Sequence, residues 1–179
     1  WSMRGGCSTS RKSGNRFFGP EVRNNGSTGM ITGEAQARAW LQSMAPKYAR
    51  EARKGDTEEQ SLALGREYMA AKFDAGYAGI NWDKEIGGQG LGHLEKIAFD
   101  AEEMQFGMPS VFFGISLGMP VPILIRYGQD REWVKERVLK ALKGEEIWCQ
   151  LFSEPAGGSD LAALRTRAEP DGNGWKMNG

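Results

Sequence analysis

The fold is decided by one stretch near the C-terminal end of the chain, Trp148-Cys149-Gln150-Leu151-Phe152-Ser153-Glu154-Pro155-Ala156-Gly157-Gly158-Ser159-Asp160. It begins within an apolar run, Ile147 to Phe152, that is typical of a buried strand, and Ser153-Glu154-Pro155 ends that run. A loop of small residues follows and closes with a hydroxyl and a carboxylate. Such loops let backbone N–H groups approach an anionic or flat ligand without interference from side chains.

The sequence before this stretch has helical periodicity. We expect helices over residues 34–54, 57–76, 93–106, 110–117 (continuing over 121–127) and 130–144. Thr57 followed by Gln60 is a capping-box pattern, Asp130 is a suitable N-cap, and Gly76 and Gly144 are suitable helix stops. In the helix at 93–106 we expect the apolar residues to face the core and the acidic ones to face solvent. The apolar set is Leu94, Ile97, Ala98, Ala101 and Met104, and the acidic set is Glu95, Asp100, Glu102 and Glu103.

A glycine-rich segment, residues 77–92, separates the second and third predicted helices. Four glycines within six positions predict a loop. Phosphate binding is an alternative, but no strand precedes the loop and no Gly-Lys-Ser/Thr sequence ends it. The one histidine, His93, has no nucleophile or ligand partner in its pattern, so a structural or solvated role is expected.

Composition excludes several classes of protein. The 23 basic and 23 acidic residues give no electrostatic case for nucleic acid or an anionic membrane as partner. Cys7 and Cys149 lie too far apart to define a disulfide framework or a metal site, so we expect no metal and a cytoplasmic location. The most apolar run, Val111 to Ile125, is interrupted by glycines and prolines. We expect it to be a buried core segment and no membrane span.

Residues 1–33 are rich in Gly, Ser, Asn and Arg, and Glu21 is their one acidic residue. We expect a disordered extension or a non-native leader, with Met30 as a plausible start. A transit peptide is the alternative, which would place the protein in the mitochondrial matrix.

After Gly144 the pattern changes from helical to alternating. Residues 164–169 alternate apolar and polar side chains and predict a half-buried strand. A turn at residues 170–174 precedes a return strand from Trp175 to Asn178. We therefore expect an α+β protein whose helices precede an unfinished sheet.

Three motifs in this order resemble the acyl-CoA dehydrogenase family, and the resemblance covers about residues 34–179. Gly144-Glu145-Glu146-Ile147-Trp148-Cys149-Gln150-Leu151-Phe152-Ser153-Glu154-Pro155-x-x-Gly158-Ser159-Asp160 is similar to the flavin-binding signature of that family. Trp82-x-Lys84-Glu85-x-Gly87-Gly88-x-Gly90-Leu91 resembles its loop between N-terminal helices. Asp171-Gly172-x-Gly174-Trp175-x-x-Asn178-Gly179 resembles its first middle-domain hairpin.

The resemblance implies an N-terminal all-α helical domain over residues 34–144 and the first strands of an incomplete β-barrel domain over residues 145–179. It implies FAD between these domains and α,β-dehydrogenation of an acyl-CoA thioester to a trans-2-enoyl-CoA. A carboxylate base removes the α-proton while the β-hydride passes to flavin N5. Electrons then leave for an electron-transferring flavoprotein, and the full-length protein is expected to be a homo-oligomer.

The resemblance also assigns site residues. Gln150, Leu151 and Phe152 fall on the strand that lines the isoalloxazine, and Ser153 takes the position that hydrogen-bonds the pyrimidine edge. Gly158 and Ser159 take the positions at the FAD pyrophosphate, and Ser159 also borders the acyl-CoA. Glu154, Pro155 and Asp160 are expected to hold the shape of the loop, while the stretch 116–122 corresponds to a border of the acyl cavity.

Two departures from the family pattern limit this assignment. Ala156-Gly157 stands where the family more often has Gly-Ala. The chain also ends before the segment expected at flavin N5 and before the domain that supplies the catalytic glutamate, so no catalytic residue is assigned and we expect the 179-residue chain alone to be inactive. Glu102, Glu103, Glu145 and Glu146 keep helix-surface or turn roles.

Alternatives of the same fold are an acyl-CoA oxidase or a flavin monooxygenase. A non-catalytic subunit that has lost flavin is the alternative from another class.

Overall fold

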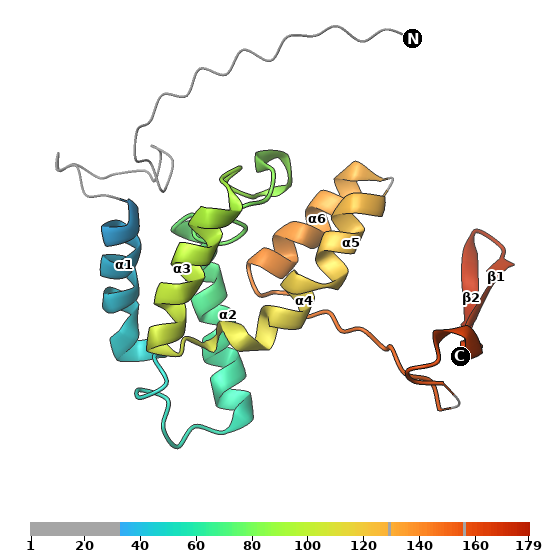
Figure 1. Ribbon diagram of the computed structural model, residues 1–179, viewed down its shortest axis with the longest axis horizontal. Coiled ribbons are helices and arrows are strands. Elements are labelled where there is room, and N and C mark those ends of the chain that lie inside the picture. The colour runs from blue at the N-terminus through green and yellow to red at the C-terminus, as the bar shows by residue number, and fades with distance from the viewer. Residues whose placement is uncertain (1–32, 129, 156) are drawn as a thin grey trace, which may run out of the picture.

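The structure is a computed structural model, and it describes residues 33–128, 130–155 and 157–179 (Figure 1). In this part of the chain, helices precede one two-stranded sheet. The helices are α1 (Gly33–Tyr48), α2 (Glu58–Asp74), η1 (Lys84–Ile86), α3 (His93–Phe106), η2 (Pro109–Phe113), α4 (Gly114–Gly118), α5 (Pro120–Tyr127), α6 (Arg131–Leu142) and η3 (Leu161–Ala163); the strands are β1 (Arg167–Asp171) and β2 (Gly174–Asn178). The predicted leader, apart from Gly33, lies outside the described residues, as does Ala156.

The predicted helix ends are confirmed at several points. Thr57 and Gln60 form both hydrogen bonds of a capping box at the start of α2. The Asp130 carboxylate accepts a hydrogen bond from the Trp133 N–H at the start of α6. Gly144, immediately after the C-cap of α6, has a φ of +74°, which favours glycine.

Two clusters of buried side chains form the core. Aromatic rings from α1, α2, α3 and the loop after α2 fill the first cluster. The Trp40 ring lies 5.0 Å from the Tyr77 ring, and Tyr77 stacks on Phe99 at 4.9 Å. The second cluster is built on the inner face of α6, with Val134 and Val138 fully buried. The spacing of apolar residues would also place Trp133 on this inner face, but its side chain is 45% exposed.

Helix α3 is oriented opposite to the sequence prediction. Leu94, Ile97 and Met104 are 72%, 62% and 79% exposed, whereas Glu102 and Glu103 are each only 7% exposed. Basic side chains on neighbouring helices explain this reversal, because a carboxylate is tolerated inside a fold when it is paired. The expectation of an outer acidic face on this helix is therefore wrong.

Glu103 is the centre of a buried polar cluster between α2 and α3. Lys72 Nζ lies 2.8 and 2.9 Å from the two Glu103 carboxylate oxygens, and the Tyr68 hydroxyl donates to the same carboxylate over 2.6 Å. Burial first, and the Glu103 charge second, raise the pKa of Tyr68 far above its ordinary value, so the phenol remains a donor. Lys72 also lies 4.8 Å from the centre of the Phe99 ring. On the α1 side, Arg38 binds Glu102 through two nitrogens.

The apolar segment 109–127 consists of three short helices. The backbone breaks at Met119, between α4 and α5, and no continuous helix runs through these residues. By length and composition alone these 19 residues could cross a membrane, with a mean hydropathy of 1.4. The run is not a fully buried core segment either, since Val111, Ile115 and Ile123 are mostly exposed.

The glycine-rich loop packs tightly against its own backbone and against α6. A methyl group at Gly88 would lie 2.2 Å from the Trp82 carbonyl oxygen, and one at Gly87 would lie 2.4 Å from Leu139 Cδ2. Close packing therefore accounts for glycine at positions 87 and 88.

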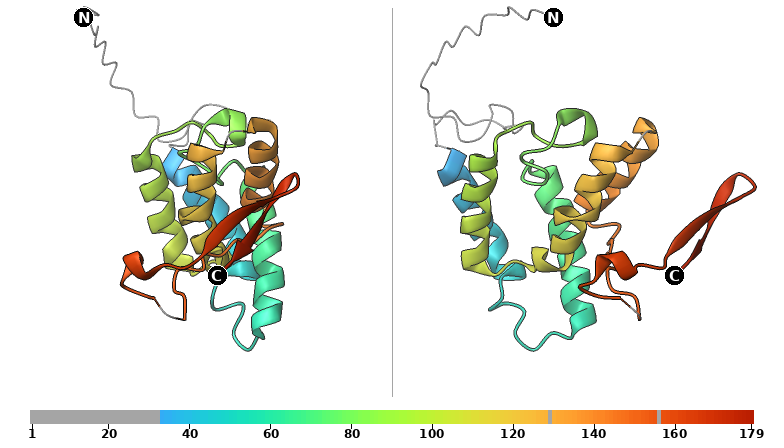
Figure 2. Two further views of the ribbon diagram at one scale, coloured as in Figure 1. Left: turned by 90° about the vertical axis from the view of Figure 1, so that its right-hand side faces the viewer. Right: turned by 45° about the vertical axis from the view of Figure 1, so that its right-hand side comes forward.

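After α6 the chain leaves the helices in an extended conformation and ends in a hairpin that stands apart from them (Figures 1 and 2). Residues 147–152 form no strand ladder with any described residue, so the predicted strand is extended but unpaired. In the hairpin Asp171 pairs with Gly174 across a two-residue turn. All residues of β1 and β2 are exposed, and the first strand is therefore not half-buried as predicted. A helical domain followed by the first strands of a sheet confirms the α+β class.

The polar cluster predicts a specific response to mutation. Lys72→Met should lower the free energy of unfolding by about 3–5 kcal/mol, because it leaves the Glu103 carboxylate buried without its cation. Lys47→Met removes the same charge from the exposed pair with Glu67 and should change stability little. Urea denaturation measures both variants. Equal losses in the two would show that burial of the Lys72 pair has no special cost.

Candidate functional site

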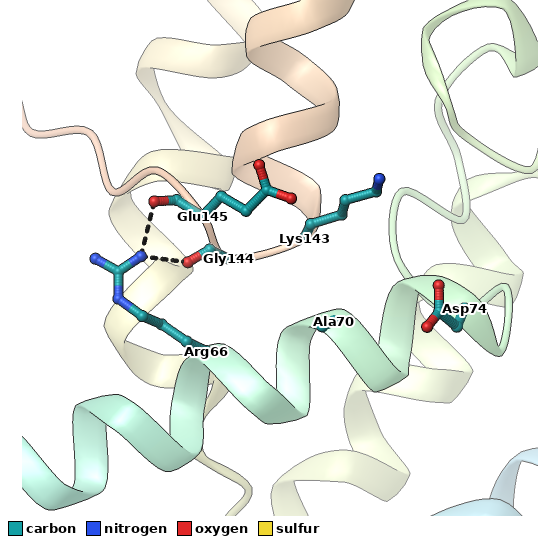
Figure 3. Close-up of a pocket in the computed structure, with 6 residues that line it drawn as sticks. All are labelled: Arg66, Ala70, Asp74, Lys143, Gly144 and Glu145. Carbon is teal, nitrogen blue, oxygen red and sulfur yellow. Dashed lines mark hydrogen bonds between the residues drawn. The ribbon is translucent and has the colours of Figure 1, made fainter.

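The candidate site begins at the connector, which we define as residues 144–148, between α6 and the extended segment. Arg66 on α2 reaches across to it: one guanidinium nitrogen donates to the carbonyl oxygens of Gly144 and Glu145 over 2.5 and 2.7 Å (Figure 3). The N–H groups of Glu145 and Glu146 donate to the Lys140 carbonyl. Side chain and backbone thus hold the first half of the connector against two helices.

The second half of the connector is held by its own side chains. The Glu146 carboxylate accepts hydrogen bonds from Arg137 on α6 over 2.6 Å and from the Trp148 indole N–H over 3.0 Å. This places the Trp148 ring against the second core cluster. The pair is only partly exposed, so solvent screens it less than a pair on the open surface.

Ser116 on α4 binds the backbone of Trp148 directly. The Trp148 N–H donates to the Ser116 hydroxyl oxygen over 2.6 Å, and the hydroxyl donates to the Trp148 carbonyl over 3.0 Å. Ser116 is completely buried. One side chain therefore satisfies both backbone groups of this residue, as a neighbouring strand would.

Beyond Trp148 the backbone has free hydrogen-bonding capacity. Within the described part of the chain, the N–H groups of residues 149–153 donate to no carbonyl or side chain. Leu151, Phe152 and Ser153 are exposed, and the side-chain oxygen of Gln150 is buried without a donor in the structure. A flat polar ligand against this segment would give these groups partners.

The following loop is held in shape by Glu154. Its carboxylate accepts hydrogen bonds from the N–H groups of Arg165 and Thr166, each over 2.7 Å, and from the Thr166 hydroxyl. Glu154 and Gly157 also exchange two backbone hydrogen bonds. Asp160 accepts hydrogen bonds from the N–H groups of Ala162 and Ala163. The loop-shaping role expected for Glu154 and Asp160 agrees with these contacts.

The loop brings together only some of the predicted site residues. A methyl group at Gly158 would lie 3.8 Å from the Ser153 hydroxyl oxygen, so these two positions are neighbours. Gly158 and Ser159 are both exposed. The segment 150–153 therefore presents open backbone, and the loop presents small side chains that leave its backbone accessible. No group of three potential metal ligands is found among the described residues.

A cavity of about 220 Å³ lies between α2, α3 and α4. Leu117 and Gly118 of the predicted acyl-cavity border line it, and Ser116 is buried beside them in the same helix. Lys72 and Glu103 also line it. A larger cavity, of about 360 Å³, opens beside Arg66 but is bounded by only six residues of α2 and the end of α6 (Figure 3).

Sequence reasoning missed the contacts that hold the connector, which are made by Arg66, Ser116, Arg137 and Glu146. No local pattern marks them, because Arg66 and Gly144 are separated by 78 positions and Ser116 and Trp148 by 32. Only the assembled helices bring these pairs together.

Comparison with known proteins agrees with this architecture. A model of the acyl-CoA dehydrogenase N-terminal domain matches residues 33–146. The acyl-CoA dehydrogenase IpdE1 of Mycobacterium tuberculosis is 33% identical over 151 residues, which are 81% of this chain and 38% of that protein. The mitochondrial isovaleryl-CoA dehydrogenase of Pongo abelii is 32% identical over 64% of this chain and 27% of its own length.

Solved structures show the same likeness. The ChsE4-ChsE5 complex from Mycobacterium tuberculosis superposes with a TM-score of 0.63 at 27% identity, covering 86% of this chain and 38% of the matched one. A steroid ACAD, Tcur3481-Tcur3483, gives a TM-score of 0.59 at 27% identity over 82% of this chain and 37% of its own. This chain thus spans less than two-fifths of each of these relatives.

Gly144→Ala should lower the free energy of unfolding by at least about 2 kcal/mol. The new methyl would lie 2.8 Å from Met69 Cβ in a backbone conformation that alanine disfavours. Gly114→Ala is the matched control, since nothing lies within 4 Å of its added methyl. Thermal unfolding compares the two, and similar melting temperatures would contradict the tight junction.

The Glu154 contacts predict a pH dependence. The Thr166 hydroxyl, followed by the Arg165 N–H, holds the pKa of Glu154 below its ordinary value. Because the folded-state pKa is lowered, this contribution to stability is present above the ordinary glutamate range and is lost as the pH falls through the folded value. Hydrogen exchange at the Arg165 and Thr166 amides, corrected for intrinsic rates, should lose its protection in that acidic range.

Glu154→Gln should weaken this protection at neutral pH and remove its acid transition. Glu169→Gln, on the exposed strand β1, serves as the control and should leave both unchanged. If the loss of protection at acidic pH persists in Glu154→Gln, a group other than Glu154 causes that loss.

Proposed function

Because this chain belongs to the acyl-CoA dehydrogenase family, we propose that its protein uses FAD to oxidise an acyl-CoA thioester to the trans-2-enoyl-CoA. The observation that carries the proposal is the open segment 149–153. Its backbone N–H groups are unpaired, and it follows Trp148, which is hydrogen-bonded to the cavity-lining helix α4. We also propose the domain boundary after Gly144, which the connector's contacts with α2, α4 and α6 support.

The described residues fit the flavin in their chemistry. FAD, when bound, supplies the hydride acceptor. Gln150, Leu151 and Phe152 would form the wall beside its ring, and Ser153 would donate from its hydroxyl and N–H to the pyrimidine edge. Donors at that edge stabilise negative charge that develops during reduction. Gly158 and Ser159 would donate backbone N–H groups to the pyrophosphate.

The substrate is proposed at the level of the thioester class. Ser159 would border the acyl-CoA, and the cavity at Leu117 and Gly118 would receive part of the acyl group. The relatives' names range from isovaleryl-CoA dehydrogenase through long-chain acyl-CoA dehydrogenase to a steroid enzyme, so the proposal names no single acyl chain.

No carboxylate in the described residues is proposed as the base. Glu102 and Glu103 are engaged by Arg38 and Lys72, and Glu146 is engaged by Arg137.

An electron-transferring flavoprotein is the proposed electron acceptor. A homo-oligomer is the proposed assembly, with the two-chain ChsE4-ChsE5 complex as the precedent for a mixed one. A cytoplasmic location also stays a proposal.

The rival functions differ in what they require of flavin. An oxidase or monooxygenase of this fold would transfer electrons to oxygen, so anaerobic and aerobic assays separate it from a dehydrogenase. A non-catalytic subunit would purify without the visible absorption of FAD. Absence of flavin from the purified protein encoded by the complete reading frame would therefore contradict the proposed enzymatic function.

Ser153→Ala in that protein should slow flavin reduction by acyl-CoA about tenfold to a hundredfold, by removing a donor at the ring edge. Anaerobic stopped-flow spectroscopy measures the reduction rate. Ser43→Ala makes the same change on the exposed side of α1 and should have no effect. Equal rates in the two variants would remove the role assigned to Ser153.

A further inference from the structure

We propose that Ser116 is a positioning residue that sets the register of the flavin-facing segment 149–153 against the cavity-lining helix α4. The inference rests on the proposed function, because it gives that segment a flavin to face. It concerns a residue that need not touch the flavin itself and acts through the backbone of Trp148.

The hydrogen bonds of Ser116 are those of a strand partner. It accepts from the Trp148 N–H over 2.6 Å and donates to the Trp148 carbonyl over 3.0 Å. Full burial of Ser116 keeps water from replacing either bond. Residues 147–152 have no ladder partner among the described residues, so this hydroxyl is their point of backbone attachment to the helices.

Register matters here because side chains alternate along an extended chain. A slip of one residue would move Gln150 and Phe152 to the side now occupied by Leu151 and Ser153. The other contacts do not prevent such a slip at Trp148. Arg66 binds carbonyls at the start of the connector, and Glu146 holds the Trp148 ring rather than its backbone.

The same helix also fixes the wall of the cavity. Leu117 and Gly118, the next two residues after Ser116, line the space proposed for the acyl group. Two hydrogen bonds therefore tie the position of the flavin-facing backbone to the position of that wall. Loss of these hydrogen bonds should misplace the flavin relative to the acyl group. Misplacement of this kind lowers the reaction rate more than it lowers the affinity for substrate.

The test uses Ser116→Ala in the protein encoded by the complete reading frame. We expect about a tenfold fall in kcat with KM changed much less, together with a shift in the visible flavin absorption bands. Ser116→Cys retains a weak donor and acceptor of similar size and should recover part of the rate. Val138→Ala is the control for destabilisation alone, since Val138 is fully buried in the core face of α6. It should lower the melting temperature without the spectral shift.

Hydrogen exchange gives a readout that needs no flavin. In Ser116→Ala, a peptide covering residues 145–153 should exchange faster than in Val138→Ala, at matched distance from the melting temperature. Unchanged exchange, or an unchanged spectrum and kcat in a flavin-loaded Ser116→Ala, overturns the positioning role. A wild-type protein without flavin would end the proposed function instead, and the exchange result would still decide whether Ser116 anchors the segment.

Discussion

The arrangement of the helical domain depends on one buried ionic contact, between Lys72 and Glu103. Taking both charges out of water is costly, and the cost is offset only by close pairing, the Tyr68 hydroxyl and the Phe99 ring. This requirement turns the acidic side of α3 inward. Its apolar residues Leu94, Ile97 and Met104 consequently face outward and are exposed. The buried charge pairs thus determine which face of α3 is apolar and exposed.

The connector fixes the position at which the chain leaves the helices. Three helices contribute one side chain each: Arg66 from α2, Ser116 from α4 and Arg137 from α6. Arg66 binds the carbonyls of Gly144 and Glu145 and restrains the start of the connector. Ser116 binds both backbone groups of Trp148 and restrains its register, and Arg137 binds the Glu146 carboxylate. The segment proposed to face the flavin is open to a ligand after Trp148 because its anchoring is complete before that point. A rigid support with free backbone beyond it is the arrangement that precise cofactor placement needs.

Local signals in the sequence predict most of the secondary structure. The capping box at Thr57, the cap at Asp130 and the glycine at 144 act within a few residues, and each lies where it was expected. The class of the fold and the loop-shaping role of Glu154 were also predictable, the latter from family resemblance. Periodicity failed on α3, because it places acidic residues outside unless distant cations such as Lys72 are known. Likewise, no pattern within the chain relates Ser116 to Trp148, since their contact exists only once α4 and α6 are packed.

The long-range contacts of the connector have a consequence for the order of folding. Arg66 and Gly144 are 78 residues apart in sequence, so closing that loop is slow compared with forming any single helix. The connector cannot reach its final position until α2, α4 and α6 have come together. Native contacts at Gly144–Trp148 are therefore late events, formed after the helices nucleate. During synthesis α2, α4 and α6 leave the ribosome before residues 144–148, so the surface that receives the connector can form before the connector arrives.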